Sequence, residues 1–213
     1  ALKVLGSDGT GWQDDIIRAI VYAVENGARI INLSLGDAQP WAPMEEAIAY
    51  ARQHGVLVVA AAGNDSRRDK NPPIVLPVMY PAAYPEAMAV AATDAMDQPC
   101  YFSNGGEALS VAAPGMGILS AQLGGGYMQM SGTSMATPQV AGLAALIWSR
   151  HPEYSPDQVQ TIIELTANDA NAATLPGHDA DLGWGRIDAR RAVRQQIYTY
   201  HAPLALRSAD RGA

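Results

Sequence analysis

The feature that most constrains this sequence is the alternation of short, β-branched apolar runs with longer segments of helical period. Residues 28–35 (ARIINLSL) and 56–62 are apolar enough for buried strands, and they flank a helical segment of about 44–54 that stops at Gly55. Such alternation is typical of βαβ units around a parallel sheet. The sequence therefore predicts an α/β fold, a doubly wound and mostly parallel sheet with helices on both faces.

The other predicted elements follow from the same patterns. Thr10 and Gln13 have the spacing of a capping box, and the helix that they would begin ends at Gly27. A buried helix starts near Ser134, and another starts at Ser155 with a proline at its first position. The list is completed by strands at 2–5, 88–93, 109–113, 118–122 and 127–130, a helix at 187–197, and loops at 65–84 and 168–184.

The composition of the sequence argues against several classes of function. With 213 residues, 48% of them hydrophobic and 16% charged, the chain can bury the core of one globular domain. Its net charge of −7 argues against nucleic acid and anionic membranes as partners, and no apolar run approaches the roughly 20 residues that cross a bilayer. The lone Cys100 has no cysteine to pair with and no His/Cys cluster around it, so neither an internal disulfide nor a zinc site is predicted.

Ser134 lies where a turn meets the start of the apolar helix. A hydroxyl there stands beside unpaired backbone N–H groups and the positive end of the helix dipole, which would stabilise a developing oxyanion. This position suits a nucleophile. The alternative is that Ser134, Ser131 or Thr133 is only the N-cap of the helix.

The segment SGTSMATPQVAGLAALI resembles the nucleophile motif of the subtilisin-like serine proteases, and Ser134 falls on the nucleophile. The segment VVAAAGND resembles the part of that family that carries the oxyanion-hole asparagine, so the resemblance gives that role to Asn64. The likeness runs from KVLGSDGTG to GWGRIDARRAV. It implies that residues 1–193 are the C-terminal portion of such a catalytic domain, and that 194–213 are the end of the last helix and a tail.

The resemblance also implies a substrate groove. Ser34, Leu35 and Gly36 would offer backbone groups to an extended peptide, and Ala61, Ala62 and Gly63 would form the facing wall of the main specificity pocket. Small residues on both walls predict room for a large side chain. Tyr80-Pro81 resembles a dipeptide that the family holds in the cis form.

Two parts of the catalytic triad have no counterpart in the sequence. The family order is Asp, His and then Ser, and no matching Asp or His segment precedes Ser134. His54, His151, His178 and His201 all lie in ordinary surface or capping contexts, and Asp8, Asp37 and Asp65 are predicted to be turn or loop residues. Gln139 replaces a histidine outside the triad. Ser110 stands where relatives that bind a weak cation carry Asp, so no metal site is predicted here, although calcium is compatible with the parent protein.

The resulting prediction is a serine endopeptidase that works through an acyl-enzyme, here the nucleophile-bearing portion and severely impaired by itself. The alternative is a non-catalytic pseudoprotease or peptide-binding module. The expected partners are a polypeptide substrate and an N-terminal fragment or propeptide of the same precursor, because the edge near 2–5 and 30–35 would otherwise stay open. By resemblance, the protein is expected to be secreted or extracytoplasmic.

Overall fold

Four strands form one parallel sheet in the computed structural model, which describes residues 1–196. They are β1 (Ile30–Leu33), β2 (Leu57–Ala61), β3 (Ala87–Thr93) and β4 (Leu109–Pro114), and they lie in that order across the sheet. All three neighbouring pairs are parallel. The side chains of β2 and β3 are buried on both faces, as expected for strands covered from both sides.

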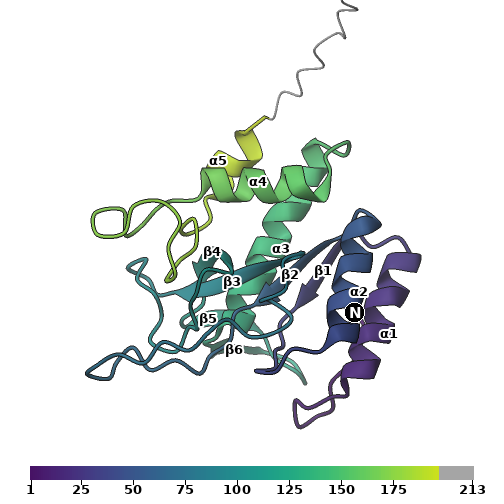
Figure 1. Ribbon diagram of the computed structural model, residues 1–213, viewed down its shortest axis with the longest axis horizontal. Helices are drawn as coiled ribbons and strands as arrows, with labels where there is room; N and C mark the ends of the chain where they lie inside the picture. The colour runs from purple at the N-terminus through teal and green to yellow at the C-terminus, as the bar shows by residue number, and fades with distance from the viewer. Residues whose placement is uncertain (197–213) are drawn as a thin grey trace, which may run out of the picture.

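Helices cover both faces of this sheet (Figure 1). On one face, α1 (Gln13–Glu25) and α2 (Ala42–Gln53) pack against alternate strand residues such as Val58 and Ala60. On the other face, α3 (Thr133–Arg150), α4 (Pro156–Thr166) and α5 (Ala189–Arg194) enclose a second core that contains Val59 and Val90. The prediction of an α/β fold with helices on both faces is confirmed.

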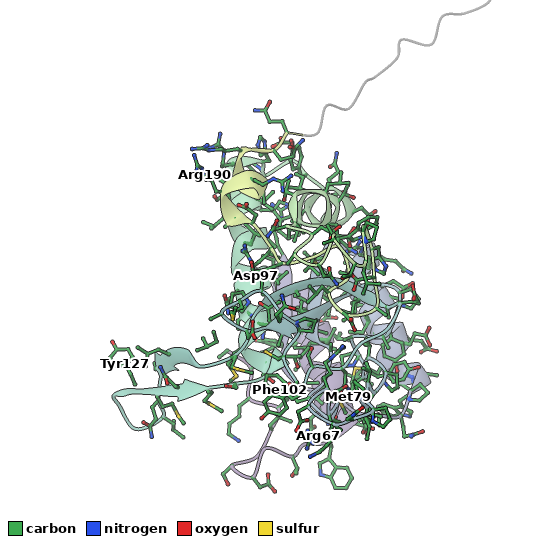
Figure 2. All side chains as sticks on the ribbon, turned by 90° about the vertical axis from the view of Figure 1, so that its left-hand side faces the viewer. Arg67, Met79, Asp97, Phe102, Tyr127 and Arg190 are labelled. Carbon is green, nitrogen blue, oxygen red and sulfur yellow. The ribbon has the colours of Figure 1, made fainter. Side chains whose placement is uncertain are left out.

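A two-stranded hairpin stands apart from the sheet. Strands β5 (Ile118–Ala121) and β6 (Tyr127–Met130) pair antiparallel, and their side chains are largely exposed. Figure 2 shows the hairpin projecting from the body, with Tyr127 on its outer part. The chain returns from β6 directly to the start of α3, so the hairpin is anchored beside the predicted nucleophile.

Three local predictions differ from the structure. Residues 2–5 form no strand, because their backbone makes no ladder with β1. Thr10 does not cap α1, since its hydroxyl and N–H are both hydrogen-bonded to the carboxylate of Asp8, and the helix begins after Trp12 without a side-chain cap. The last helix starts later than predicted because the Ile187 N–H donates to the Ala112 carbonyl, 2.9 Å away, and Asp188 then caps α5.

Other predicted boundaries hold. Ser155 caps α4 with the complete reciprocal capping box that includes Gln158. The predicted cis form of the peptide bond between Tyr80 and Pro81 is also present.

Of the predicted helix end and tail at 194–213, the part from residue 197 on lies outside the described residues. In the part of the chain that is described, no helix has the length and apolar character to cross a membrane.

Candidate active site

Ser134 occupies the second position of α3. The N-cap is Gly132, and no side chain caps the helix, so the alternative reading of Ser131, Thr133 or Ser134 as a capping residue does not apply. Within residues 1–196, no hydrogen bond uses the Ser134 N–H as a donor, as expected for one of the first N–H groups of a helix. Ser134 is half-buried. A free backbone donor and a hydroxyl therefore stand together at the positive end of an 18-residue helix.

Asn64 is held in one orientation by the residue before Ser134. Its Oδ1 accepts hydrogen bonds from the Thr133 N–H at 2.8 Å and from the Thr133 hydroxyl at 3.1 Å. Because a backbone N–H can only donate, this contact assigns the oxygen and leaves the Asn64 Nδ2 group as a donor facing elsewhere. Asn64 is exposed, so that donor is accessible.

One cavity of about 170 Å³ joins most of the predicted site. Ser134 and Asn64 line it together with Leu35, Gly36, Ala61 and Gly63, which are six of the eight predicted residues. The cavity therefore has two N–H donors on one side and the predicted substrate walls on the others. This arrangement can stabilise an oxyanion formed at a carbonyl beside Ser134.

The other two predicted residues lie behind the cavity. The Ser34 hydroxyl donates to the Ser134 carbonyl at 3.0 Å, while the Ser134 hydroxyl donates to the Ser34 carbonyl over a long 3.4 Å. Ala62 is fully buried: its N–H donates to the Val90 carbonyl and its carbonyl accepts the Met79 N–H. Ser34 therefore ties the two sides of the site together, and Ala62 supports the wall without lining it.

A second cavity of about 390 Å³ begins on the other side of residues 34–36. Ser34, Leu35 and Gly36 line it, and so do Trp41, Tyr80 and Tyr84. Among the described residues, the backbone N–H and C=O groups of Leu35 and Gly36 take part in no hydrogen bond. This short segment thus presents unpaired backbone groups between two hollows, which is the form of a groove for an extended peptide.

Sequence reasoning missed Met79, and it considered Asp65 only as a turn or loop residue and Thr133 only as a cap. All three line the cavity with Ser134. Thr133 could have been found from its place directly before Ser134. The neighbouring Tyr80-Pro81 bond pointed to an ordered turn at Met79, but not to a side chain inside the pocket.

Three histidines contact groups that do not belong to the cavity. His54 Nδ1 lies 2.8 Å from the Tyr50 carbonyl, His151 Nδ1 lies 3.3 Å from Glu153, and His178 Nε2 lies 2.7 Å from the Leu109 carbonyl. None of them lines the cavity, and His201 lies outside the described residues. Within the described part of the chain, Ser134 therefore has no general base within hydrogen-bond reach.

Gln139 and Ser110, the two other departures from the family pattern, lie in ordered surroundings. Gln139 Nε2 donates to the carbonyls of Pro114 and Met135, at 2.6 and 2.9 Å, and so ties α3 to the end of β4. Ser110 is buried at 8% exposure. Among residues 1–196, no three His, Cys, Asp or Glu side chains gather in a way that could hold a metal ion.

Comparisons with known proteins agree on one family. The model of the subtilase family matches residues 1–185. Subtilisin BL of Lederbergia lenta is 39% identical over 194 residues, which are 91% of this chain and 67% of that protein. Alkaline elastase YaB of Bacillus sp. strain YaB is 40% identical over 193 residues, covering 91% of this chain but 47% of the relative.

Solved structures give the same result. Fervidolysin from Fervidobacterium pennivorans, described as a keratinolytic enzyme related to subtilisin, matches with a TM-score of 0.78 and 32% identity over 91% of this chain and 31% of its own. The prenylagaramide maturation protease PagA matches with a TM-score of 0.76 and 33% identity, covering 88% of this chain and 69% of its own. With the family model spanning most of its length, this chain belongs to the subtilase family.

Proposed function

We propose that this chain is the nucleophile-bearing portion of a serine endopeptidase. One observation carries the proposal: the Ser134 hydroxyl, the free Ser134 N–H and the oriented amide of Asn64 share a single cavity. Membership of the subtilase family and the similarity to subtilisins support it. The substrate would be a polypeptide.

In this mechanism the Ser134 Oγ attacks the carbonyl carbon of the scissile peptide bond while a base takes the hydroxyl proton. The carbonyl oxygen becomes an oxyanion and accepts hydrogen bonds from the Ser134 N–H and Asn64 Nδ2. The tetrahedral intermediate expels the amine, which receives the proton, and an ester to Ser134 remains. Water then attacks this ester, releasing the acid and restoring the serine.

The peptide would bind as an extended strand beside residues 34–36. The free backbone groups of Leu35 and Gly36 would pair with it by β-augmentation. The Ser34 hydroxyl, which donates to the Ser134 carbonyl, fixes this segment relative to the nucleophile. The scissile carbonyl can then be presented to Ser134 in a constant orientation.

The general base would come from outside the described residues. The outer edge of β1 has no strand beside it in the described sheet, and a cavity of about 300 Å³ runs along it. Apolar residues of α1 and β1 line that cavity, including Ile16, Ile20, Ile31 and Leu33. We propose that a second polypeptide, an N-terminal fragment or propeptide of the same precursor, covers this edge and brings the catalytic His and Asp. The greater length of Subtilisin BL and Alkaline elastase YaB supports a further segment.

A non-catalytic peptide-binding module is the second candidate, favoured by the lack of a base near Ser134 in the described residues. The retention of Ser134 and Asn64 in one cavity favours the enzyme, because binding alone needs neither group.

The two candidates are separated by an active-site fluorophosphonate probe and a chromogenic peptide, applied to this chain and to the protein translated from the complete gene. We expect labelling and turnover in the complete protein, lost in Ser134→Ala and kept in the neighbouring Ser131→Ala control. The isolated chain should show neither at a comparable rate. Brisk turnover by the isolated chain that depends on Ser134 would contradict the external base, and a folded complete protein that is never labelled would support the binding module.

A further inference from the structure

Met79 stands in the space that the small wall residues leave. A methyl group added at Gly63 would lie 2.7 Å from both Cγ and Sδ of Met79, and one added at Gly36 would lie 3.2 Å from its Cβ. Gly36 and Gly63 belong to opposite walls of the cavity, and Met79 lines the same cavity. The methionine side chain therefore packs between the two glycines and occupies part of the space in which a large substrate side chain was expected.

The backbone fixes Met79 in this place. Its N–H donates to the Ala62 carbonyl at 2.9 Å, and its carbonyl accepts the Ala83 N–H at 2.9 Å. The next residue, Tyr80, exchanges two hydrogen bonds with Asp37, at 2.8 and 2.9 Å. Residues 79–80 thus bridge from the wall at β2 to the wall that follows β1, and Met79 forms the floor between them. Figure 2 labels Met79 in the lower part of the body, away from the outer part of the hairpin.

The remaining volume limits what the pocket can hold. An enclosed cavity of about 150 Å³ accommodates a benzene molecule. The cavity here measures about 170 Å³, but that volume includes the space beside Ser134 and Asn64, where the substrate carbonyl must lie. The Met79 side chain takes up part of the space between the two walls, so a substrate side chain has less room here than the small wall residues alone would leave.

We propose that Met79 is the specificity-determining residue of this pocket and restricts the substrate residue before the scissile bond to small aliphatic side chains. The inference rests on the proposed function, since it assumes that this cavity receives that residue. Asp65 also lines the cavity and carries a carboxylate, so a basic side chain is the competing preference that the test must include.

The test measures peptide affinity rather than hydrolysis. The protein translated from the complete gene, carrying Ser134→Ala so that peptides stay intact, is titrated by fluorescence polarisation with peptides that differ only in the residue before the scissile bond: Ala, Val, Phe or Lys. We expect the Ala and Val peptides to bind at least about tenfold more tightly than Phe, the order of effect of one misfitting group in an apolar pocket. Adding Met79→Gly should improve Phe binding relative to Ala by about tenfold or more.

Two further variants control for damage to the fold. Met79→Leu keeps a floor of similar volume and should keep the order of affinities. Met96→Ala makes a comparable truncation at a methionine that is 81% exposed and outside the cavity, and it should change nothing. Thermal unfolding of each variant shows which proteins are folded.

A wild-type preference for Phe or Lys overturns the inference, and so does a folded Met79→Gly protein whose preferences are unchanged. Absence of binding by all peptides overturns it as well. Because affinity needs no proton transfer, a protein that discriminates as expected but never hydrolyses peptides would refute the proposed function and leave the role of Met79 standing.

Discussion

Replacing Thr133 with valine should destabilise the protein although the two side chains have nearly the same shape. Thr133 is fully buried at the junction of β2 and α3. Its hydroxyl donates to Asn64 Oδ1 at 3.1 Å and accepts the buried Gly63 N–H at 3.2 Å. Valine removes both contacts and leaves the Gly63 N–H without its acceptor.

The cost can be estimated from these two contacts. Asn64 is exposed, and its Oδ1 still accepts the hydrogen bond from the Thr133 backbone N–H in the variant. Losing the hydrogen bond from the Thr133 hydroxyl to Asn64 therefore costs little, about 0.5 kcal/mol. The stranded Gly63 N–H costs about 1–3 kcal/mol. The total of about 1.5–3.5 kcal/mol corresponds to a fall in the melting temperature of about 3–14 °C for a domain of this size.

Thermal unfolding followed by circular dichroism measures this change. Thr137→Val is the matched control, because Thr137 is equally buried and its hydroxyl makes a single bond of 2.8 Å to the Thr133 carbonyl, within the helix. The free energy of unfolding of the Thr137→Val control should fall by about 1 kcal/mol or less. A Thr133→Val protein that melts no lower than Thr137→Val would refute the reasoning, since it would show that the hydroxyl bridge between Asn64 and Gly63 contributes nothing.

Three other predictions follow from single residues. Asn64→Ala should lower kcat by a factor of about 10²–10³, with little change in KM, in steady-state assays of the complete protein. The factor is the one known for subtilisin and is carried over to this relative. An unchanged kcat would show that Asn64 does not stabilise the oxyanion. Burial, with a smaller contribution from the negative charge of Asp94, raises the pKa of Cys100 to about 12, so at pH 8 the native thiol should resist iodoacetamide and react only after unfolding; rapid labelling of folded protein would contradict this. Burial also raises the pKa of Glu164 above its ordinary value, so the contribution of this side chain to stability is present at low pH and is lost as the pH rises through the folded pKa. Glu164→Gln should therefore raise the melting temperature at pH 8 but not near pH 4. The control Glu46→Gln, at an exposed residue, should show no such pH-dependent effect.

Local patterns predicted the parts of the fold that local chemistry determines. The buried strand β2 is apolar along its whole length, β3 is apolar up to its last residue, Thr93, and the capping box at Ser155 involves residues three apart, so each is visible in a short window of sequence. Residues 2–5 have the composition of a strand but no ladder, because strand formation depends on a neighbour for its hydrogen bonds. Composition alone does not contain that information.

The site shows the same division. Ser134 and Asn64 lie in recognisable motifs at the ends of regular elements, and the structure brings them to one cavity. Met79 lies in a segment of weak periodicity, and its position depends on long-range hydrogen bonds to Ala62 and, through Tyr80, to Asp37. The pocket floor is therefore a tertiary feature, which is why the small wall residues alone did not reveal the Met79 side chain that lies between them.

The three parts of the candidate site also differ in how firmly the described sheet holds them. Asn64 follows β2, which has β1 and β3 as neighbours, and Ser134 begins a helix that packs into the main core. The wall at residues 34–36 instead continues β1, whose outer edge is unpaired in the described sheet and bordered by an apolar cavity. A polypeptide that covers this edge would stabilise the strand that carries the wall as well as supply the base. The proposed partner is therefore expected to contribute to peptide binding and to proton transfer together, while the oxyanion donors are already fixed by Thr133.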